Sequence, residues 1–112
     1  MVSLWAAGLS IVAAAGPLRP TPQEAPVVYR VPVTGTVEMG LAPFVARSLA
    51  EAAEASAADV VLDIDTPGGR VDAAWEYIDA VRDARVPVFA YINRRALSAG
   101  AMIALSAGEV YM

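Results

Sequence analysis

The sequence predicts an α/β fold with a parallel β-sheet, for three reasons. Short segments rich in β-branched residues alternate with amphipathic segments throughout residues 27–112. The amphipathic segments repeat their apolar residues at helical spacing, whereas the β-branched segments have the length of strands. The chain has 112 residues, which is enough for one small domain. Since strands that alternate with helices pair in parallel through right-handed crossovers, we expect that arrangement here.

The first half of this region is expected to hold two strands around one helix. Residues 27–37 alternate well enough to be a strand, and Gly35 interrupts them. Residues 40–57 form the predicted helix, because charged side chains such as Glu51 fall away from its apolar stripe. That stripe consists of Leu41, Phe44, Val45, Leu49, Ala52 and Ala53. Residues 59–65 follow as a short, β-branched strand.

The second half is expected to continue the alternation and to end in a strand. Residues 71–84 are predicted as a helix, and residues 86–92 as a strand apolar enough to be buried on both faces. Residues 93–97 are predicted as a loop before a short apolar helix over 98–107. The apolar face of the longer helix is expected to consist of Val71, Ala74, Trp75, Ile78 and Val81. The chain stops within a fourth strand, 109–112, so we expect an incomplete sheet and a fragment of a longer protein.

The N-terminal segment is expected to lie outside the folded domain. Residues 1–16 contain an apolar run that ends in Ala13, Ala14 and Ala15, as a signal peptide does. The run is shorter than the ~20 residues of a membrane-spanning helix. Its start carries no Lys or Arg, so a membrane anchor and a wrongly assigned start are kept as alternatives. Residues 17–26 are rich in proline and are expected to form an extended linker.

The composition excludes several classes of function. The net charge is −4, and the 8 basic residues are all arginine and form no basic patch, so nucleic acid is not expected as a partner. Cysteine is absent, which excludes disulfides and thiolate metal sites. Histidine and lysine are absent too, so most side chains that act as a base near neutral pH are missing. We expect no cofactor and no metal.

A glycine-rich loop follows the second expected strand. In the stretch DIDTPGGR, Pro67 fixes a turn, and Gly68 and Gly69 permit backbone angles closed to other residues. Backbone N–H groups at such a turn are able to hold a developing oxyanion, although a tight turn with no further role explains the same residues. Asp63 and Asp65 share one face of the strand with no third ligand nearby, so we expect turn capping or solvation rather than metal binding.

A serine, Ser98, stands where the third expected strand and its loop give way to a helix. A helix N-terminus concentrates unpaired N–H groups and partial positive charge, which favour an alkoxide or an oxyanion. Serine is also a common helix N-cap, so a purely structural role is the stronger explanation of this residue taken alone. Ala99 and Gly100 are small, and we expect them to keep the space around the hydroxyl clear for a substrate carbonyl.

Both loops follow the carboxyl ends of strands, where open α/β sheets place their active crevices. They are therefore expected to face each other, with the N–H groups of Gly69 and Ala99 flanking the Ser98 hydroxyl. Two backbone donors beside a nucleophile meet the requirements of acyl transfer.

The two loops and the segments around them resemble a known family. The stretches LDIDTPGGRVDAAWEYIDAV and VPVFAYINRRALSAGAMIALSAGEVYM are similar to the NfeD-type membrane-bound serine proteases, the stomatin-operon partners, of the Clp-protease/crotonase-like superfamily. The resemblance covers residues 27–112 and implies the N-terminal part of a protease domain, with Ser98 as nucleophile and Gly69 and Ala99 as the oxyanion hole. It also implies a Ser-Lys dyad whose lysine lies several tens of residues beyond the serine. The chain contains no lysine, so the base is expected beyond residue 112, and this segment alone is expected to be inactive.

The resemblance further implies a membrane-associated homo-oligomer that is exported by its signal peptide. Its expected activity is that of an endopeptidase that cleaves apolar segments of peptides or membrane proteins, stomatin-like proteins among them. Two alternatives stay open. The missing lysine favours a non-catalytic, protease-like scaffold that binds a membrane partner. A crotonase-fold enzyme for acyl-CoA thioesters would use similar backbone donors, but a signal peptide argues against it because acyl-CoA is cytosolic.

Overall fold

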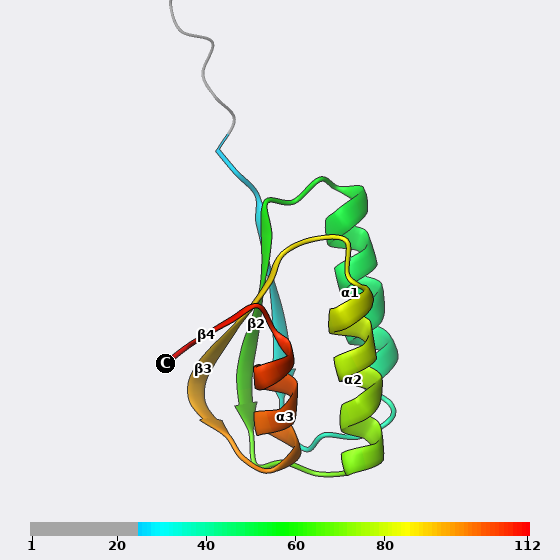
Figure 1. The fold of residues 1–112 in the computed structure, drawn as a ribbon, viewed down its shortest axis with the longest axis vertical. Helices are drawn as coiled ribbons and strands as arrows, with labels where there is room; N and C mark the ends of the chain where they lie inside the picture. The colour runs from blue at the N-terminus through cyan, green and yellow to red at the C-terminus, as the bar shows by residue number, and fades with distance from the viewer. Residues whose placement is uncertain (1–24) are drawn as a thin grey trace, which may run out of the picture.

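The computed structural model describes residues 25–112 and contains a four-stranded sheet in which all neighbouring strands are parallel. The strands lie side by side in chain order: β1 (Val28–Thr34), β2 (Asp59–Thr66), β3 (Val88–Ala96) and β4 (Glu109–Tyr111). The helices between them are α1 (Ala42–Glu54), α2 (Val71–Asp83) and α3 (Ala99–Ser106) (Figure 1). The predicted α/β class and parallel sheet are confirmed.

Two predictions about the N-terminus fall outside the part of the chain that the structure describes. They are the signal peptide over residues 1–16 and nearly all of the linker, since only residues 25 and 26 of it are described. Within residues 25–112, no helix is both long enough and apolar enough to cross a membrane.

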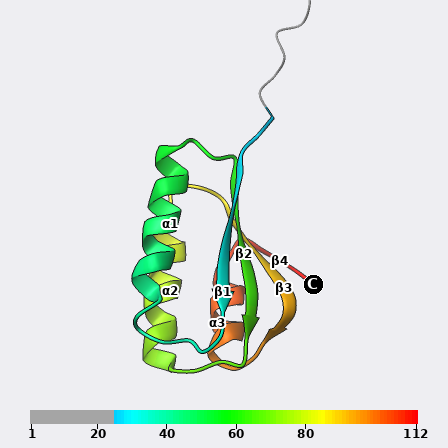
Figure 2. The same ribbon diagram turned by 180° about the vertical axis from the view of Figure 1, so that it is seen from behind.

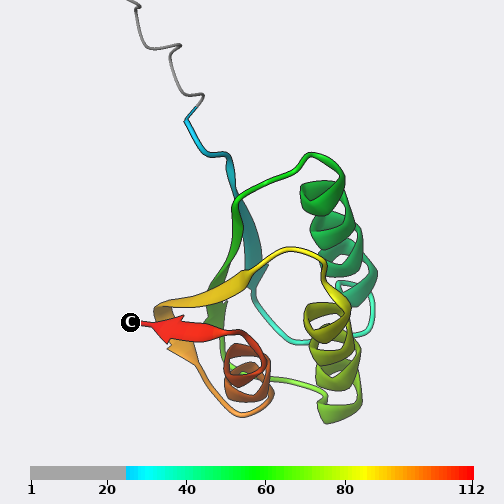
Figure 3. The same cartoon turned by 45° about the horizontal axis from the view of Figure 1, so that its top comes forward.

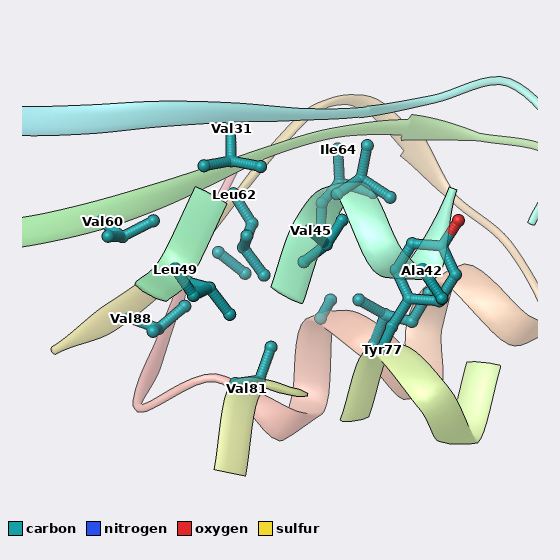
Figure 4. Close-up of a cluster of buried hydrophobic side chains, with 14 of the residues drawn as sticks. Val31, Ala42, Val45, Leu49, Val60, Leu62, Ile64, Tyr77, Val81 and Val88 are labelled. Atoms are coloured by element: carbon teal, nitrogen blue, oxygen red, sulfur yellow. The ribbon is translucent and has the colours of Figure 1, made fainter. Parts of the chain in front are cut away.

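The helices cover one face of the sheet. In Figure 1 α3 lies in front of the strands, and in the opposite view of Figure 2 it lies behind them. Helices α1 and α2 run beside each other (Figure 3). Alternate strand residues turn toward the helices, so that Val31 of β1 and Leu62 of β2 are paired across the sheet and both are buried. Figure 4 shows these side chains with Val45 and Leu49 of α1 and Tyr77 of α2, in the apolar core whose burial drives folding.

The structure corrects the apolar faces predicted for the helices. Val71 and Trp75 of α2 are 51% and 48% exposed, and Phe44 of α1 is 38% exposed. The buried stripe of α2 consists of Ala73, Ala74, Tyr77, Ile78 and Val81. Val71 and Trp75 fall at the border of this stripe, which the described residues leave open to solvent.

The third strand differs from its prediction in length and in burial. β3 continues to Ala96, so residues 93–96 belong to the strand and not to a loop. Its pairing with β2 is irregular, because Ile64 pairs with Ile92 whereas Thr66 pairs with Ala96. The extra residues of β3 form a bulge, which bends a strand locally. The prediction that this strand is buried on both faces is wrong for the described residues, since Tyr91 points away from the helices and is 41% exposed.

The face opposite the helices carries an ion pair between β1 and β2. Arg30 Nε donates to Asp63 Oδ2 at 2.7 Å, and the Asp63 side chain is only 9% exposed. The prediction that Asp63 is solvated or caps a turn is therefore wrong. Asp63 lies in the interior of its strand, opposite Pro32, where Arg30 reaches it from the neighbouring strand.

Candidate active site

The glycine-rich loop after β2 and the turn before α3 meet at the carboxyl edge of the sheet, as predicted. Both lie at the lower end of the sheet in Figure 1. A Cβ atom placed on Gly68 would lie 2.9 Å from the Leu97 carbonyl oxygen and 3.0 Å from Ser98 Cβ. The Leu97 N–H also donates to the carbonyl oxygen of Thr66 at 3.2 Å. The two segments are therefore in direct contact.

Ser98 has a backbone conformation that residues other than glycine rarely adopt. Its φ is 50° and its ψ is −119°, the angles of the first central residue of a type II′ turn. The turn is closed by the Gly100 N–H, which donates to the Leu97 carbonyl oxygen at 2.8 Å. Such strained residues cluster at functional sites, where the surrounding structure holds them in place.

The Ser98 side chain is exposed, and its hydroxyl makes no hydrogen bond to any described residue. Ser98 directly precedes α3, yet its side chain does not cap the helix. Its backbone carbonyl oxygen accepts the first hydrogen bonds of the helix, from the N–H groups of Ala101 at 2.9 Å and Met102 at 3.4 Å. The geometry therefore does not support a side-chain cap, and the hydroxyl is free to meet a ligand.

Two backbone N–H groups of these loops find no acceptor among residues 25–112, namely those of Gly69 and Ala99. Gly69 pairs with Val37 only through its neighbours, since the Val37 N–H donates to the Gly68 carbonyl and the Arg70 N–H donates to the Val37 carbonyl. The N–H of Gly69 itself thus points away from Val37. Ala99 is the first residue of α3, where N–H groups have no partner within the helix. An oxyanion is the kind of ligand that such a pair of donors suits.

Three glycines owe their identity to close packing around these loops. A Cβ atom on Gly69 would lie 2.3 Å from the Val37 carbonyl oxygen, and one on Gly100 would lie 2.3 Å from Thr66 Cγ2. Gly68 has a φ of 101°, which favours glycine. The role predicted for Gly100 is corrected accordingly, because its lack of a side chain makes room for Thr66. Ala99 is fully buried and places its methyl group in the core.

The second acidic residue of β2 is also held by an arginine. Asp65 Oδ1 lies 3.3 Å from Arg95 Nε of the bulged end of β3, although this oxygen is buried and makes no hydrogen bond. Asp65 is thus engaged across the sheet and does not cap the turn. Within residues 25–112, no three His, Cys, Asp or Glu side chains lie close enough together to hold a metal ion.

An exposed ion pair that sequence reasoning missed adjoins the glycine-rich loop. Arg70 donates to both carboxylate oxygens of Asp72, with Nε 2.9 Å from Oδ1. The hydrogen bond from Arg70 is the main reason why the pKa of Asp72 lies below its usual value. The Asp72 carboxylate also accepts a hydrogen bond from the Ala73 N–H in the first turn of α2, where an acidic residue is favourable. A signal was present in the sequence, since an aspartate two residues after an arginine opens the predicted helix.

Residues 27–112 match the sequence profile of the family described as NfeD1b, N-terminal domain. The chain belongs to this NfeD1b family. Over 89 residues it is 51% identical to the membrane protein NfeD1b of Bacillus subtilis, a match that covers 80% of this chain and 20% of that protein. It is 28% identical over 89 residues to the membrane-bound protease PH1510 of Pyrococcus horikoshii, a match that covers 77% of this chain and 20% of the protease. The chain spans about a fifth of the length of these curated relatives.

Solved protease structures share the fold of this NfeD1b-family domain. A serine-to-alanine variant of the 1510-N membrane-bound stomatin-specific protease gives a TM-score of 0.73 at 25% identity, over 79% of this chain and 44% of its own. A lysine-to-alanine variant of 1510-N in complex with a substrate peptide gives 0.72 at 26% identity, over 79% and 42%. ClpP1 from Listeria monocytogenes gives 0.63 at 26% identity, over 70% and 46%. The predicted Clp-protease-like fold and the predicted family are confirmed.

The 112 residues of this NfeD1b-family chain contain no histidine or lysine to serve as a base for Ser98. Arginine does not substitute for them, because its guanidinium stays protonated in proteins. Arg95 and Arg70 are in addition engaged by Asp65 and Asp72. The described residues thus offer a candidate nucleophile and candidate oxyanion donors, but no group suited to take the proton.

Proposed function

We propose that this domain forms part of a serine endopeptidase of the Ser-Lys type, with Ser98 as its nucleophile. The observation that carries the proposal is the placement of Ser98, whose exposed, unpaired hydroxyl stands on a strained turn. The N–H groups of Gly69 and Ala99 have no acceptor among the described residues and serve as the oxyanion hole. The names of two relatives agree with this chemistry, since PH1510 is called a membrane-bound protease and 1510-N binds a substrate peptide.

In the proposed reaction, Ser98 Oγ attacks the carbonyl carbon of the scissile peptide bond while a base takes its proton. The oxyanion of the tetrahedral intermediate accepts hydrogen bonds from the Gly69 and Ala99 N–H groups. The C–N bond then breaks, the base returns the proton to the leaving amine, and an acyl-enzyme remains. Water attacks this ester with help from the same base, which releases the acid product and restores the serine. The base is a lysine that the 112 residues do not contain.

The proposal extends to the substrate and the location. The substrate is an apolar segment of a peptide or membrane protein, stomatin-like proteins included, and the enzyme acts outside the cytoplasm as a membrane-associated homo-oligomer. The names of two relatives support the membrane association and the stomatin-like substrate, since NfeD1b is called a membrane protein and 1510-N stomatin-specific. Val71 and Leu97 are 51% and 53% exposed and lie within two residues of Gly69 and Ser98, so they offer apolar surface beside the site.

A non-catalytic scaffold is the second candidate, and one observation favours it. The chain lacks both histidine and lysine, so these residues alone have no side chain suited to activate Ser98. A scaffold predicts a Ser98 hydroxyl that does not react faster than any other exposed serine.

Labelling with a fluorophosphonate separates the two candidates. The protein, expressed from its complete gene, is treated with the probe, and the modified residue is found by peptide mapping. The protease predicts modification at Ser98 that is lost in Ser98→Ala, lost when the lysine base is replaced, and kept in Ser48→Ala. Ser48 is a suitable control because its hydroxyl bonds to the Phe44 carbonyl oxygen on α1, away from the site. A folded protein that never labels at Ser98, whatever the pH or the probe, contradicts the protease and leaves the scaffold.

A further inference from the structure

We propose that Thr66 is a positioning residue for acyl transfer, which holds the Ser98 turn and the glycine-rich loop in a fixed relation. The proposal rests on the proposed function. Thr66 is the last residue of β2, and its side chain is fully buried at 0% exposure. Because it is buried, it does not touch a substrate, so any effect on the chemistry passes through its neighbours.

The hydroxyl of Thr66 orders the glycine-rich loop. Its Oγ1 accepts a hydrogen bond from the Gly68 N–H at 3.0 Å, in a turn that the side chain closes on its own backbone. Gly68 is buried and has a φ of 101°, so this bond satisfies a buried donor in an unusual conformation. With the Gly68 N–H occupied in this way, the Gly69 N–H is left as the free donor of the loop.

The carbonyl oxygen and the Cγ2 methyl of Thr66 contact the two ends of the turn that contains Ser98. Its carbonyl oxygen accepts the Leu97 N–H at 3.2 Å, at the first residue of the turn. Its Cγ2 methyl packs against the backbone of Gly100, the last residue of the turn, where a Cβ atom would come within 2.3 Å of it. Thr66 therefore contacts both segments of the candidate site. It bonds to the loop that contains Gly69, and it contacts both ends of the turn that contains Ser98 and Ala99.

This arrangement explains how Ser98 persists in a strained conformation. A residue with such angles is retained only where its surroundings fix it from several sides. Thr66 supplies two of these constraints, namely the hydrogen bond to Leu97 and the packing against Gly100. Its hydroxyl also bonds to Gly68, the neighbour of Gly69. A displacement of about 1 Å between a nucleophile and the groups that assist it lowers the reaction rate on the order of 100-fold. Contacts that fix the distance between Ser98 and the oxyanion donors are therefore expected to affect the rate of acyl transfer.

The test compares Thr66→Val, which removes the hydroxyl and keeps the shape, with Thr66→Ser, which keeps the hydroxyl. Thr34→Val is the matched control, because Thr34 is exposed on β1. Each protein is expressed from its complete gene, and fluorophosphonate labelling of Ser98 is followed across probe concentrations. We expect Thr66→Val to lower the maximal labelling rate about 10- to 100-fold with little change in the half-saturating concentration. We expect Thr34→Val to stay close to the unsubstituted protein. Thr66→Ser should label faster than Thr66→Ala, which differs from it only in the hydroxyl, although both lose the Cγ2 contact with Gly100.

Hydrogen exchange of the Gly68 amide gives a readout that does not depend on activity. Thr66→Val should expose this amide to faster exchange, whereas Thr66→Ser should protect it. If Thr66→Val does not fold, Thr66→Ala and Thr66→Ser are compared instead, as this pair differs only in the hydroxyl.

Each outcome decides between the two proposals. Labelling of Thr66→Val at the unsubstituted rate overturns the positioning role, as does a Thr66→Ser variant that labels no faster than Thr66→Ala. If the unsubstituted protein does not label at all, the proposed protease function is refuted. Hydrogen exchange of the Gly68 amide then tests whether Thr66 orders the loop. Unchanged exchange in Thr66→Val then overturns the structural role too, whereas faster exchange supports Thr66 as the residue that orders the loop.

Discussion

Replacing Ser98 by glycine should leave the protein more stable than replacing it by alanine. Both changes remove the hydroxyl, but only alanine keeps a Cβ atom at a φ of 50° and a ψ of −119°. Angles of this kind cost about 1–3 kcal/mol for a residue other than glycine. Glycine loses more backbone freedom on folding, which costs about 0.5–1 kcal/mol relative to alanine. The difference leaves Ser98→Gly ahead by about 1 kcal/mol, or roughly 4–8 °C in melting temperature for a domain of this size.

The assay is urea and thermal unfolding of both variants beside the unsubstituted protein. Since the Ser98 hydroxyl caps nothing, Ser98→Ala should match the unsubstituted protein to within about 0.5 kcal/mol. Ser56 also has a left-handed φ, of 54°, so Ser56→Gly and Ser56→Ala form a control pair outside the site. If the alanine variant of Ser98 is as stable as the glycine variant, the turn is not strained. If Ser98→Ala loses about 1 kcal/mol, its hydroxyl caps α3 after all.

Three further predictions concern the packing around the site and the sheet. Gly100→Ala should cost about 1–3 kcal/mol in urea unfolding, because the added methyl meets the buried Thr66 Cγ2; unchanged stability would show that α3 is not seated on Thr66. Arg30→Ala should cost about 1–3 kcal/mol by leaving the Asp63 carboxylate without its partner, and adding Asp63→Asn should recover part of the loss; full additivity of the two changes would refute the pairing. Tyr77→Phe should cost about 0.5–1.5 kcal/mol by removing the hydrogen bond from Tyr77 to the Glu38 carbonyl oxygen. Burial raises the pKa of Tyr77, so the neutral phenol is favoured in the folded state. This contribution is full below the unfolded pKa of about 10 and declines as the pH rises toward the folded pKa. Unfolding at alkaline pH should therefore show a larger decline in the protein that keeps Tyr77, since Tyr111, whose pKa is also raised, titrates in both proteins.

The sequence was enough to predict the order of the elements and the meeting of the two loops at one edge of the sheet. Alternation of strand and helix patterns leads to a parallel sheet, and the carboxyl-edge rule brings Gly69 and Ser98 together without any coordinates. The angles of Ser98 were not predictable, because serine itself prefers other angles and the turn is in contact with Thr66, which is distant in the sequence. The structure brings Gly68 against Leu97 and Ser98, and the assignment of Ser98, Gly69 and Ala99 to the site stays a prediction.

Pairings between distant residues account for most of what was missed. Arg30 and Asp63 lie 33 residues apart, and only the strand register brings them together. The bulge of β3 escaped notice because residues 93–95 are polar and resemble a loop, although the backbone continues the sheet to Ala96. Val71 and Trp75 fit the apolar periodicity of a helix. How far the buried face of that helix extends depends on which neighbouring elements cover it, and periodicity alone does not give this.

The contact between Val37 and Gly69 has a practical consequence for engineering this domain. Val37 makes backbone hydrogen bonds to Gly68 and Arg70, the residues on both sides of Gly69. The segment that follows β1 is therefore held against the glycine-rich loop. An affinity tag, fluorophore or inserted peptide at residues 35–40 would therefore disturb the site from behind. The turns at residues 55–58 and 84–87 lie at the amino ends of β2 and β3, the opposite edge of the sheet. Those turns are the places to attach a reporter that leaves Ser98 as it is found here.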